Sequence, residues 1–377
     1  MKTLRFSPRL TAMDGARMEA HAADMIRDTA RMDALRAAAE KTLATPPVSV
    51  VNRTIRAASG DVHDYSSCGP YWWPNPDTPD GMPYIRRDGE INPASRDASD
   101  FSHVFAAVET LTLAAYYFDE PRYAADAVRR IRVFFLDPET LCHPHLKYSQ
   151  AIPGTCDGRG IGIIDTHMSF RFFAAVALLD AMGELPAEVM EGLRAWYNAF
   201  TDWLLTDENG RDEFRQHNNH GAWYDEQVAA AALFLDRKIL AESTLTLAYE
   251  QRTLKHIRPD GTQPHELART NAMSYSLMNL LALMLLANMA EYCGAGIDHW
   301  NTVRAEGDLP LRSALEYVAR YAADLTDFPY RQINGKPDPD ACARLMTIAA
   351  RHYPDGDYLR RAAAWQSPTS LWCLWPW

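Results

Sequence analysis

The chain has 377 residues, of which 47% are hydrophobic and 23% are charged, the balance of a globular chain with enough apolar material for a large core. This composition excludes a disordered or collagen-like chain. Its 38 lysines and arginines against 49 aspartates and glutamates give a net charge of −11, which opposes a general role on nucleic acid or on an anionic membrane. An anionic partner therefore needs a local basic cleft.

The chain carries no sign of division or of covalent cross-linking. No Ser/Gly linker, low-complexity tract or charge block interrupts it, which predicts a single domain over residues 1–377. The six cysteines are scattered without a CxxC pair, so we expect free thiols rather than a disulfide framework or a structural zinc site. The start, MKTLRFSPRLTAMDGARMEAH, lacks the apolar segment of a secretory signal, which is compatible with a cytoplasmic protein or with one whose leader has been removed.

Apolar residues recur at helical spacing along most of the chain. The first helix, expected over residues 11–43, places Met25, Ile26, Met32 and Leu35 near one stripe. Further helices are expected at 101–117, 123–135, 166–182, 187–205, 221–240, 245–257, 274–292, 311–321 and 340–352. Within the most membrane-like stretch, 275–292, several polar residues favour a core helix over a membrane span.

This pattern predicts an all-α fold of stacked helical hairpins, because sustained strand-like alternation is missing and short turns join the helices in pairs. Several helices are apolar on more than one face, so inner helices must be covered on both sides. A two-layered α/α toroid meets this need, and a solenoid is the alternative, although no repeat of fixed period is found. The loops at one end of a toroid surround a concave mouth that suits a long, chain-like ligand.

An aromatic loop occupies residues 48–92, and we expect it to form a lid over the mouth. Four prolines between Pro70 and Pro79 exclude a helix there. Its aromatic residues, which would be costly to expose without a purpose, are Tyr65, Tyr71, Trp72, Trp73 and Tyr84. In one interpretation the rings stack on sugars while Arg86 and Arg87 pair with carboxylates; in the other the rings plug the core.

A polar run, HNNH, meets a predicted helix at Gly221. Helix amino ends favour negative charge, so Asn219 and His220 are candidates for holding a carboxylate, and His220 is also a candidate base. The alternative is that Asn219 caps the helix and His220 makes one structural hydrogen bond. A metal site at His217 and His220 is a weaker hypothesis, because no third ligand follows at a familiar spacing.

Two further segments carry candidate groups. PDGTQPHELARTNAMSY delivers Glu266, Arg269 and Tyr275 to the start of an apolar helix; the arginine is expected to lower the pKa of the tyrosine, the alternative being a surface pair. The glycine-rich 147–167 fits no nucleotide-binding motif. Its polar residues at the lip of the mouth are Gln150, Arg159 and His167.

Four motifs in order resemble the alginate lyase superfamily over roughly residues 60–290: GPYWWPNPDTPDGMPYIRRDGEIN, QAIPGTCDGRGIGIIDTH, NNHGAWYDEQ and DGTQPHELARTNAMSYS. Their spacing is more similar to polysaccharide lyase family 38 than to family 5. The resemblance implies a toroid, a sevenfold one, and metal-independent β-elimination on mannuronate-rich alginate or β-1,4-glucuronan, with no cofactor. The amino-terminal helices and the tail SLWCLWPW lie outside it.

Carried over by position, the resemblance assigns carboxylate neutralisation and proton handling to Asn219 and His220. It assigns support of the catalytic tyrosine to Arg269 and the roles of base and acid to Tyr275. The substrate-binding residues expected are Tyr71, Trp72, Trp73, Arg86, Gln150, Arg159, His167, Trp223 and Glu266. The cations of the cleft segments are Arg86, Arg87, Arg96, Lys147, Arg159 and Arg269, and their local charge would outweigh the mean field.

The chemistry predicts an anionic polysaccharide or oligosaccharide partner. A single tyrosine can remove H5 and protonate O4 only where both leave from one face, as in β-D-mannuronate and β-D-glucuronate; L-guluronate and galacturonate would need a second base, for which His220 is the candidate. The alternative enzyme is a toroid glycoside hydrolase that uses paired carboxylates. Its acids would come from Asp165, Asp225, Glu226 and Glu266. A non-catalytic, lectin-like protein is the other alternative.

Overall fold

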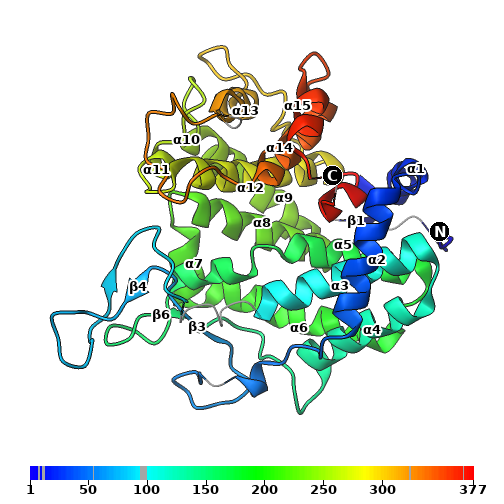
Figure 1. Cartoon of the computed structure of the whole chain (residues 1–377), viewed down its shortest axis with the longest axis horizontal. Helices are drawn as coiled ribbons and strands as arrows, with labels where there is room; N and C mark the ends of the chain where they lie inside the picture. The colour runs from blue at the N-terminus through cyan, green and yellow to red at the C-terminus, as the bar shows by residue number, and fades with distance from the viewer. Residues whose placement is uncertain (7–8, 11–12, 54, 94–99, 322–323, 368) are drawn as a thin grey trace.

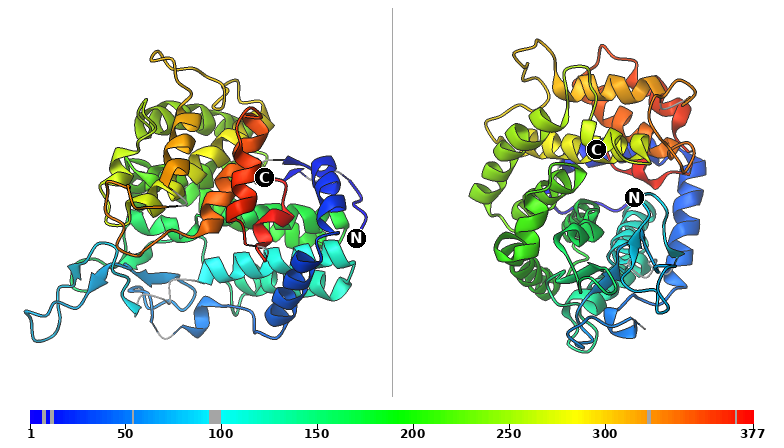
Figure 2. Two further views of the ribbon diagram at one scale, coloured as in Figure 1. Left: turned by 45° about the horizontal axis from the view of Figure 1, so that its top comes forward. Right: turned by 90° about the vertical axis from the view of Figure 1, so that its left-hand side faces the viewer.

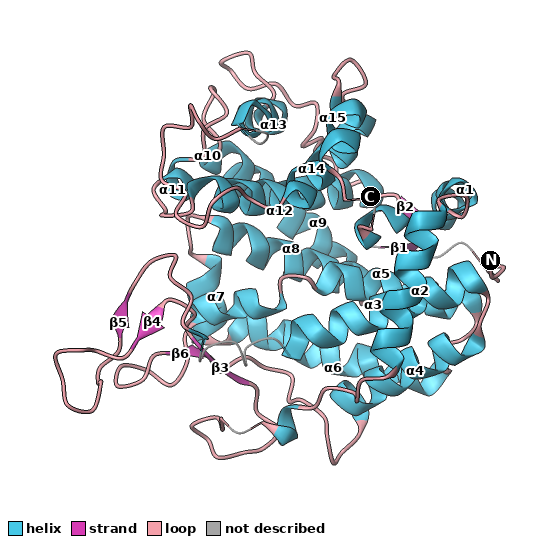
Figure 3. Ribbon diagram, viewed as in Figure 1, coloured by secondary structure: helices cyan, strands magenta, loops and turns pink. Residues whose placement is uncertain are grey.

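The computed structural model describes residues 1–377 except 7–8, 11–12, 54, 94–99, 322–323 and 368. Helices dominate it and the strands are short (Figure 3). The helices are α1 (Gly15–Met25), α2 (Thr29–Leu43), α3 (Asp100–Phe118), α4 (Pro121–Ile131), α5 (Ser169–Met182), α6 (Ala187–Thr206), α7 (Glu208–Phe214), α8 (Asn219–Phe234), α9 (Lys238–Ala248), α10 (Leu254–His256), α11 (Pro264–Leu267), α12 (Ala272–Cys293), α13 (Pro310–Tyr321), α14 (Pro339–His352) and α15 (Tyr358–Trp365).

The helices form an α/α toroid, which confirms the predicted fold class. Consecutive antiparallel helices stack beside one another from α3 to α14 (Figure 1). Seen from the side that carries the β4–β5 hairpin, they lie around an incomplete ring (Figure 2). Inner helices such as α5, α8 and α12 bury residues on nearly every face, as the two-layer arrangement requires.

Several helix boundaries differ from the prediction. The expected helix 11–43 is two helices, because the chain turns at residues 26–28 and the Asp28 side chain caps α2. The expected helix 221–240 is also two, since Asp236 adopts a left-handed backbone (φ 59°) between α8 and α9. The short helices α7 and α15 were not predicted, and their apolar stripes are too brief to give a periodic signal.

Helix α12, which contains the membrane-like stretch, lies in the core. It packs against α8, α9, α13 and α14. Two segments, Gly160–Met182 and Ala272–Cys293, are long and apolar enough to cross a membrane by length and composition, and 61% and 78% of their apolar windows are buried inside the fold. The burial of α12 agrees with the prediction of a core helix.

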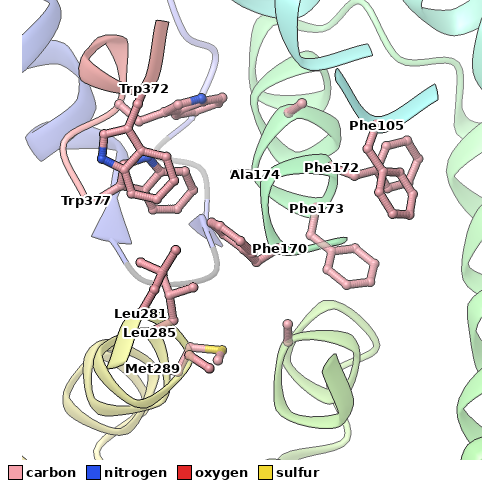
Figure 4. Close-up of a cluster of buried hydrophobic side chains, with 14 of the residues drawn as sticks. Phe105, Phe170, Phe172, Phe173, Ala174, Leu281, Leu285, Met289, Trp372 and Trp377 are labelled. Atoms are coloured by element: carbon pink, nitrogen blue, oxygen red, sulfur yellow. The ribbon is translucent and has the colours of Figure 1, made fainter. Parts of the chain in front are cut away.

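The carboxyl-terminal tail forms an aromatic plug, defined here as Trp372, Trp375 and Trp377, all at most 3% exposed. Phe170 of α5 points toward two of these rings, with α12 leucines beneath them (Figure 4). The Trp375 indole N–H donates to the buried Glu109 carboxylate at 2.7 Å. The plug therefore ties the end of the chain to α3 and α5.

The described strands make three two-stranded pairs: β1 (Arg9–Leu10) with β2 (Met13–Asp14), β3 (Ser66–Cys68) with β6 (Tyr148–Ala151), and β4 (Trp72–Trp73) with β5 (Ile85–Arg86). The β3–β6 pair is parallel and the β4–β5 pair is an antiparallel hairpin. The predicted aromatic loop is thus a strand followed by a projecting hairpin (Figure 1). All six cysteines are free, as expected.

Candidate active site

A cleft of about 840 Å³ opens at the end of the toroid that carries the hairpin. Ten of the predicted site residues line it: Tyr71, Trp72, Arg86, Gln150, Arg159, His167, Asn219, His220, Arg269 and Tyr275. They come from the hairpin, from β6 and the turn after it, and from the starts of α8 and α12. Segments that are far apart in sequence therefore meet around one opening.

The Tyr275 hydroxyl, in the first turn of α12, lies at the centre of a short hydrogen-bond network. The Arg269 Nη2 donates to it at 2.9 Å, and its guanidinium lies 3.9 Å from the tyrosine ring centre. The Tyr71 hydroxyl of the hairpin lies 2.5 Å from the same oxygen. Two groups able to donate thus converge on one phenol oxygen, an arrangement that stabilises a phenolate.

The net pKa shift of Tyr275 is opposite to the predicted one. Burial raises the pKa of Tyr275, and Tyr71 adds to this when Tyr275 is the donor, whereas Arg269 only partly opposes both. The hydroxyl is therefore protonated in the free protein. When Tyr71 donates instead, it lowers the cost of the phenolate, so the direction of this hydrogen bond decides how readily Tyr275 acts as a base.

Arg269 is held by an aspartate that the sequence analysis did not single out. Asp88, at the base of the hairpin, accepts from Arg269 Nη2 at 2.7 Å and from the backbone N–H of Thr270 at 3.2 Å. It also accepts from Arg86 at 2.7 Å. Arg269 holds the pKa of Asp88 at about 2, although burial acts in the opposite direction. Asp88 therefore both attaches the hairpin to the segment before α12 and holds Arg269 in place.

Asn219 is the first residue of α8, and the helix is capped by its neighbour Asn218, whose side chain accepts from the His220 N–H. Glu266 accepts from the Asn219 backbone N–H at 2.6 Å and from its Nδ2 at 2.8 Å. The side-chain amide has two N–H groups, so a second donor is left for the cleft. The alternative that Asn219 is the cap is wrong.

Glu266 itself corrects the prediction of substrate contact. It is 1% exposed and does not line the cleft. Burial raises its pKa, while the two hydrogen bonds from Asn219 act in the opposite direction. Its geometry is that of a group that orients Asn219.

His220 is oriented by a second buried carboxyl, Glu213 of α7. The His220 Nδ1 lies 2.7 Å from the Glu213 carboxylate, which is fully buried. This contact engages Nδ1 and leaves Nε2 for the cleft. His217 is exposed and joins no described cluster of metal-ligating groups, so the structure does not support the hypothesis of a metal site shared with His220.

A second group of polar residues forms the wall opposite. Arg159 donates to the carbonyl and to the side chain of Gln150, both at 3.0 Å, and stacks over Trp72. Among the described residues no carboxylate pairs with Arg159 within 4.0 Å. An arginine without a partner acid is a ready receptor for a ligand carboxylate.

His167 lines the cleft in its neutral form, because burial lowers its pKa to about 4. Trp223 lies behind it, 1% exposed, with ring centres 4.9 Å apart, so the predicted contact of Trp223 with substrate is wrong. Trp73 also lies outside the cleft, where Arg87 covers its ring. Lys147 does not line it either, and Arg96 lies outside the described residues.

The four acids of the hydrolase alternative do not converge. Asp225 is paired with Arg252 in the interior at 2.7 Å, and Glu226 is fully buried. Glu266 is occupied by Asn219. Among the described residues, Asp165 is the one acid that lines the cleft; it accepts from Ser67 at 2.6 Å. The described cleft thus lacks the pair of carboxylates that hydrolysis requires.

Comparison with known proteins agrees with this geometry. Residues 49–328 match the family model for alginate lyase. A solved alginate lyase from Bacteroides ovatus is 32% identical, covers 99% of both chains and superposes with a TM-score of 0.89. Alginate lyase A1-III from Sphingomonas species A1 is 15% identical over 88% of this chain and 90% of that chain, with a TM-score of 0.51. A tetrasaccharide complex of A1-III, 14% identical over 88% and 90% of the two chains, gives 0.56.

The two A1-III structures show the shared fold alone, whereas the family match covers most of the chain. A search of curated proteins gave no match. The chain belongs to the alginate lyase family. It is a polysaccharide lyase.

Proposed function

We propose that this enzyme cleaves β-1,4-linked uronate polymers, mannuronate-rich alginate or glucuronan, by syn β-elimination in the manner of family 38. The observation that carries the proposal is the Tyr275 hydroxyl, 2.9 Å from Arg269 Nη2 in the cleft that Asn219 and His220 also line. This arrangement supports the proposal, because the reaction needs a base, a group that stabilises the anion of that base, and donors for a carboxylate around one opening.

The step needs neither water nor a redox partner. The C5–H bond breaks and its proton passes to the Tyr275 phenolate, while the electron pair moves into the carboxylate as an enediolate. Negative charge grows on the carboxylate oxygens, where the free N–H of Asn219 and the His220 Nε2, when protonated, meet it. The C4–O4 bond then breaks, C4=C5 forms, and the proton passes from Tyr275 to O4.

The configuration of the sugar at C4 and C5 limits which polymers one tyrosine can cleave. One phenol serves both proton transfers when H5 and O4 lie on one face, as in mannuronate and glucuronate, which differ only at C2. L-guluronate presents the two groups on opposite faces and would need His220 as base. We therefore expect polymannuronate and glucuronan to be cut faster than polyguluronate and polygalacturonate.

Local charge supports an anionic chain despite the net charge of −11. Arg86, Arg159 and Arg269 all line the cleft. Arg269 is balanced by Asp88, whereas Arg159 is not balanced by a described acid within bonding distance. A uronate carboxylate that binds Arg159 gives it the counter-charge it lacks, within a Debye length of about 8 Å.

The test is a panel of the four polymers followed by ultraviolet absorbance, which reports the unsaturated C4=C5 ends. Tyr275→Phe should lower kcat/KM on the best polymer by about 10³-fold, in the range of general acid–base catalysis, while oligosaccharide binding persists. Tyr330→Phe, at an exposed tyrosine, is the matched control. Wild-type rates in Tyr275→Phe would refute the role of this phenol.

Two other outcomes would replace the proposal. New reducing ends without ultraviolet absorbance would indicate hydrolysis, and binding without any new ends would indicate a lectin-like protein. We assign no metal ion to the elimination itself, so a chelator should leave the initial rate at 25 °C unchanged. Loss of that rate on chelation, restored by added metal, would overturn this part of the mechanism.

A further inference from the structure

A cluster of three metal-ligating side chains lies outside the cleft, at the start of the β3–β6 pair. Asp64 lies two residues before β3, and His143 and His145 lie five and three residues before β6. The His143 Nδ1 lies 2.8 Å from Asp64 Oδ1, and the His145 Nε2 lies 3.2 Å from the same oxygen. None of the three lines the cleft, and the elimination proposed above uses none of them.

We propose that Asp64, His143 and His145 form a binding site for one divalent transition-metal ion, with Zn²⁺ as its natural probe. Their ligand atoms all lie within 4.8 Å of one another. Tetrahedral zinc with bonds of about 2.0–2.1 Å places its ligand atoms roughly 3.3 Å apart. Movements of less than about 1 Å would therefore convert the observed hydrogen-bonded pairs into ligands around an ion.

The surroundings also hold the carboxylate of the cluster in place. The Asp64 side chain is 8% exposed, and Ser59 donates to its other oxygen at 2.6 Å, which fixes its orientation.

The two histidine side chains are exposed enough for an ion to reach the site from solvent. They are 37% and 25% exposed for His143 and His145, so the carboxylate lies beneath two partly exposed imidazoles. Three protein ligands leave a fourth position for water. The Lys147 N–H lies 3.5 Å from the His145 Nδ1, and this weak contact would be lost when Nε2 binds the ion and Nδ1 carries the proton.

The position of the cluster gives the ion a structural role. From β3 the chain continues to the hairpin that carries Tyr71, and β6 itself contains Gln150 and leads on to Arg159. The backbone N–H of His143 already donates to the His63 carbonyl at 2.9 Å. A bound ion would clamp the two entering segments together and stabilise the strand pair behind the cleft wall.

The experiment uses untagged, chelator-treated full-length protein titrated with Zn²⁺ by calorimetry. We expect one equivalent to bind with micromolar or tighter Kd and to raise Tm by about 2–5 °C at a hundredfold excess over Kd. Asp64→Asn and His145→Gln should each weaken binding at least tenfold. His265→Gln, at an exposed histidine elsewhere, should bind as wild type does.

Absence of saturable binding to the wild type, or equal binding by Asp64→Asn, would overturn the site. Should a variant fail to fold, Co²⁺ added to the wild type keeps the test open: intense visible absorption bands of tetrahedral cobalt support the site, and weak octahedral bands refute it. Because none of these readouts is turnover, they are separate from the test of the elimination.

Discussion

The cleft and the aromatic plug are built by different forces. At the cleft, charged and polar groups hold one another in pairs: Asp88 with Arg269, Glu266 with Asn219, and Glu213 with His220. The aromatic plug instead buries large rings against α5 and is joined to α3 through the bond from Trp375 to Glu109. Hydrogen bonds orient the side chains of the cleft, whereas the burial of apolar surface stabilises the plug.

The difference teaches that stability and activity are separable here. A column of rings, from Trp377 through Phe170 and Trp223 to His167, connects the plug to the cleft floor. Packing of apolar rings does not orient proton donors or acceptors. Changes in the plug should therefore alter the stability of the fold, and changes at the cleft should alter the reaction rate. Variants of the plug and of the cleft should therefore differ in whether stability or rate changes.

The largest expected effect is on the plug. Trp375→Ala removes a ring that is 1% exposed and should destabilise the protein by about 3–5 kcal/mol, measured by denaturant unfolding. The kcat of the folded fraction should stay within about twofold of wild type. Trp375→Phe, which keeps most of the ring and loses the bond to Glu109, should cost less. A large loss of kcat in folded Trp375→Ala would break the separation.

At the cleft, Asp88→Asn keeps the shape of the side chain and removes its charge. We expect kcat/KM to fall about 10- to 100-fold because Arg269 is less well placed, with Tm nearly unchanged. The Asp88 charge raises the pKa of Tyr275, so its removal should lower that pKa. The alkaline limb of the rate profile, in which kcat/KM rises as Tyr275 ionises, should then move to lower pH. Asp77→Asn, at an exposed hairpin position, is the control, and an unmoved limb would show a merely structural role.

The pH dependence tests the base directly. Burial and Tyr71 raise the pKa of Tyr275 above its ordinary value, and the base form is the phenolate. Its population therefore rises tenfold per pH unit below that pKa. We expect kcat/KM to increase toward alkaline pH, up to about tenfold per unit between pH 7 and 9. A maximum near pH 6–7 would transfer the role of base to His220.

The smallest expected effect concerns Glu226 on α8, a helix that starts at the cleft and is buried along most of its length. It is fully buried, and neither oxygen has a hydrogen-bond partner among the described residues. Burial raises its pKa well above the ordinary 4.5, so its destabilising effect appears as pH rises above 4.5 and vanishes below it. Glu226→Gln should stabilise the protein by about 1 kcal/mol or more at pH 7, and by little near pH 4.

Most of the cleft could be located from the sequence, because its candidate catalytic groups lie in compact motifs at helix starts. Asn219 and His220 follow a polar run, and Arg269 and Tyr275 share one segment. Asp88 was missed because its partner Arg269 is 181 residues away and the hairpin offers several similar acids. Glu213 precedes His220 by seven residues, and its position in the same polar run was the available signal.

The prediction that Trp223 and Glu266 contact substrate rested on their nearness in sequence to the motif residues. On a helix, neighbours in sequence point to different sides, and these two point inward, one behind His167 and one beneath Asn219. The aromatic loop divides likewise. Tyr71 and Trp72 line the cleft, while Tyr65 is fully buried in the core. Stacking of the two cleft rings on a sugar stays a prediction.

Helical periodicity, the scarcity of strand signals and the polar helix starts were sufficient to predict an all-α toroid with a cleft, since each depends on residues within a few turns of one another. Contacts over long distances in sequence were decided by the tertiary structure alone. Tyr71 and Tyr275 are 204 residues apart, and burial at that meeting point raises the pKa of Tyr275. Sequence spacing cannot report this, because desolvation depends on everything packed around a group.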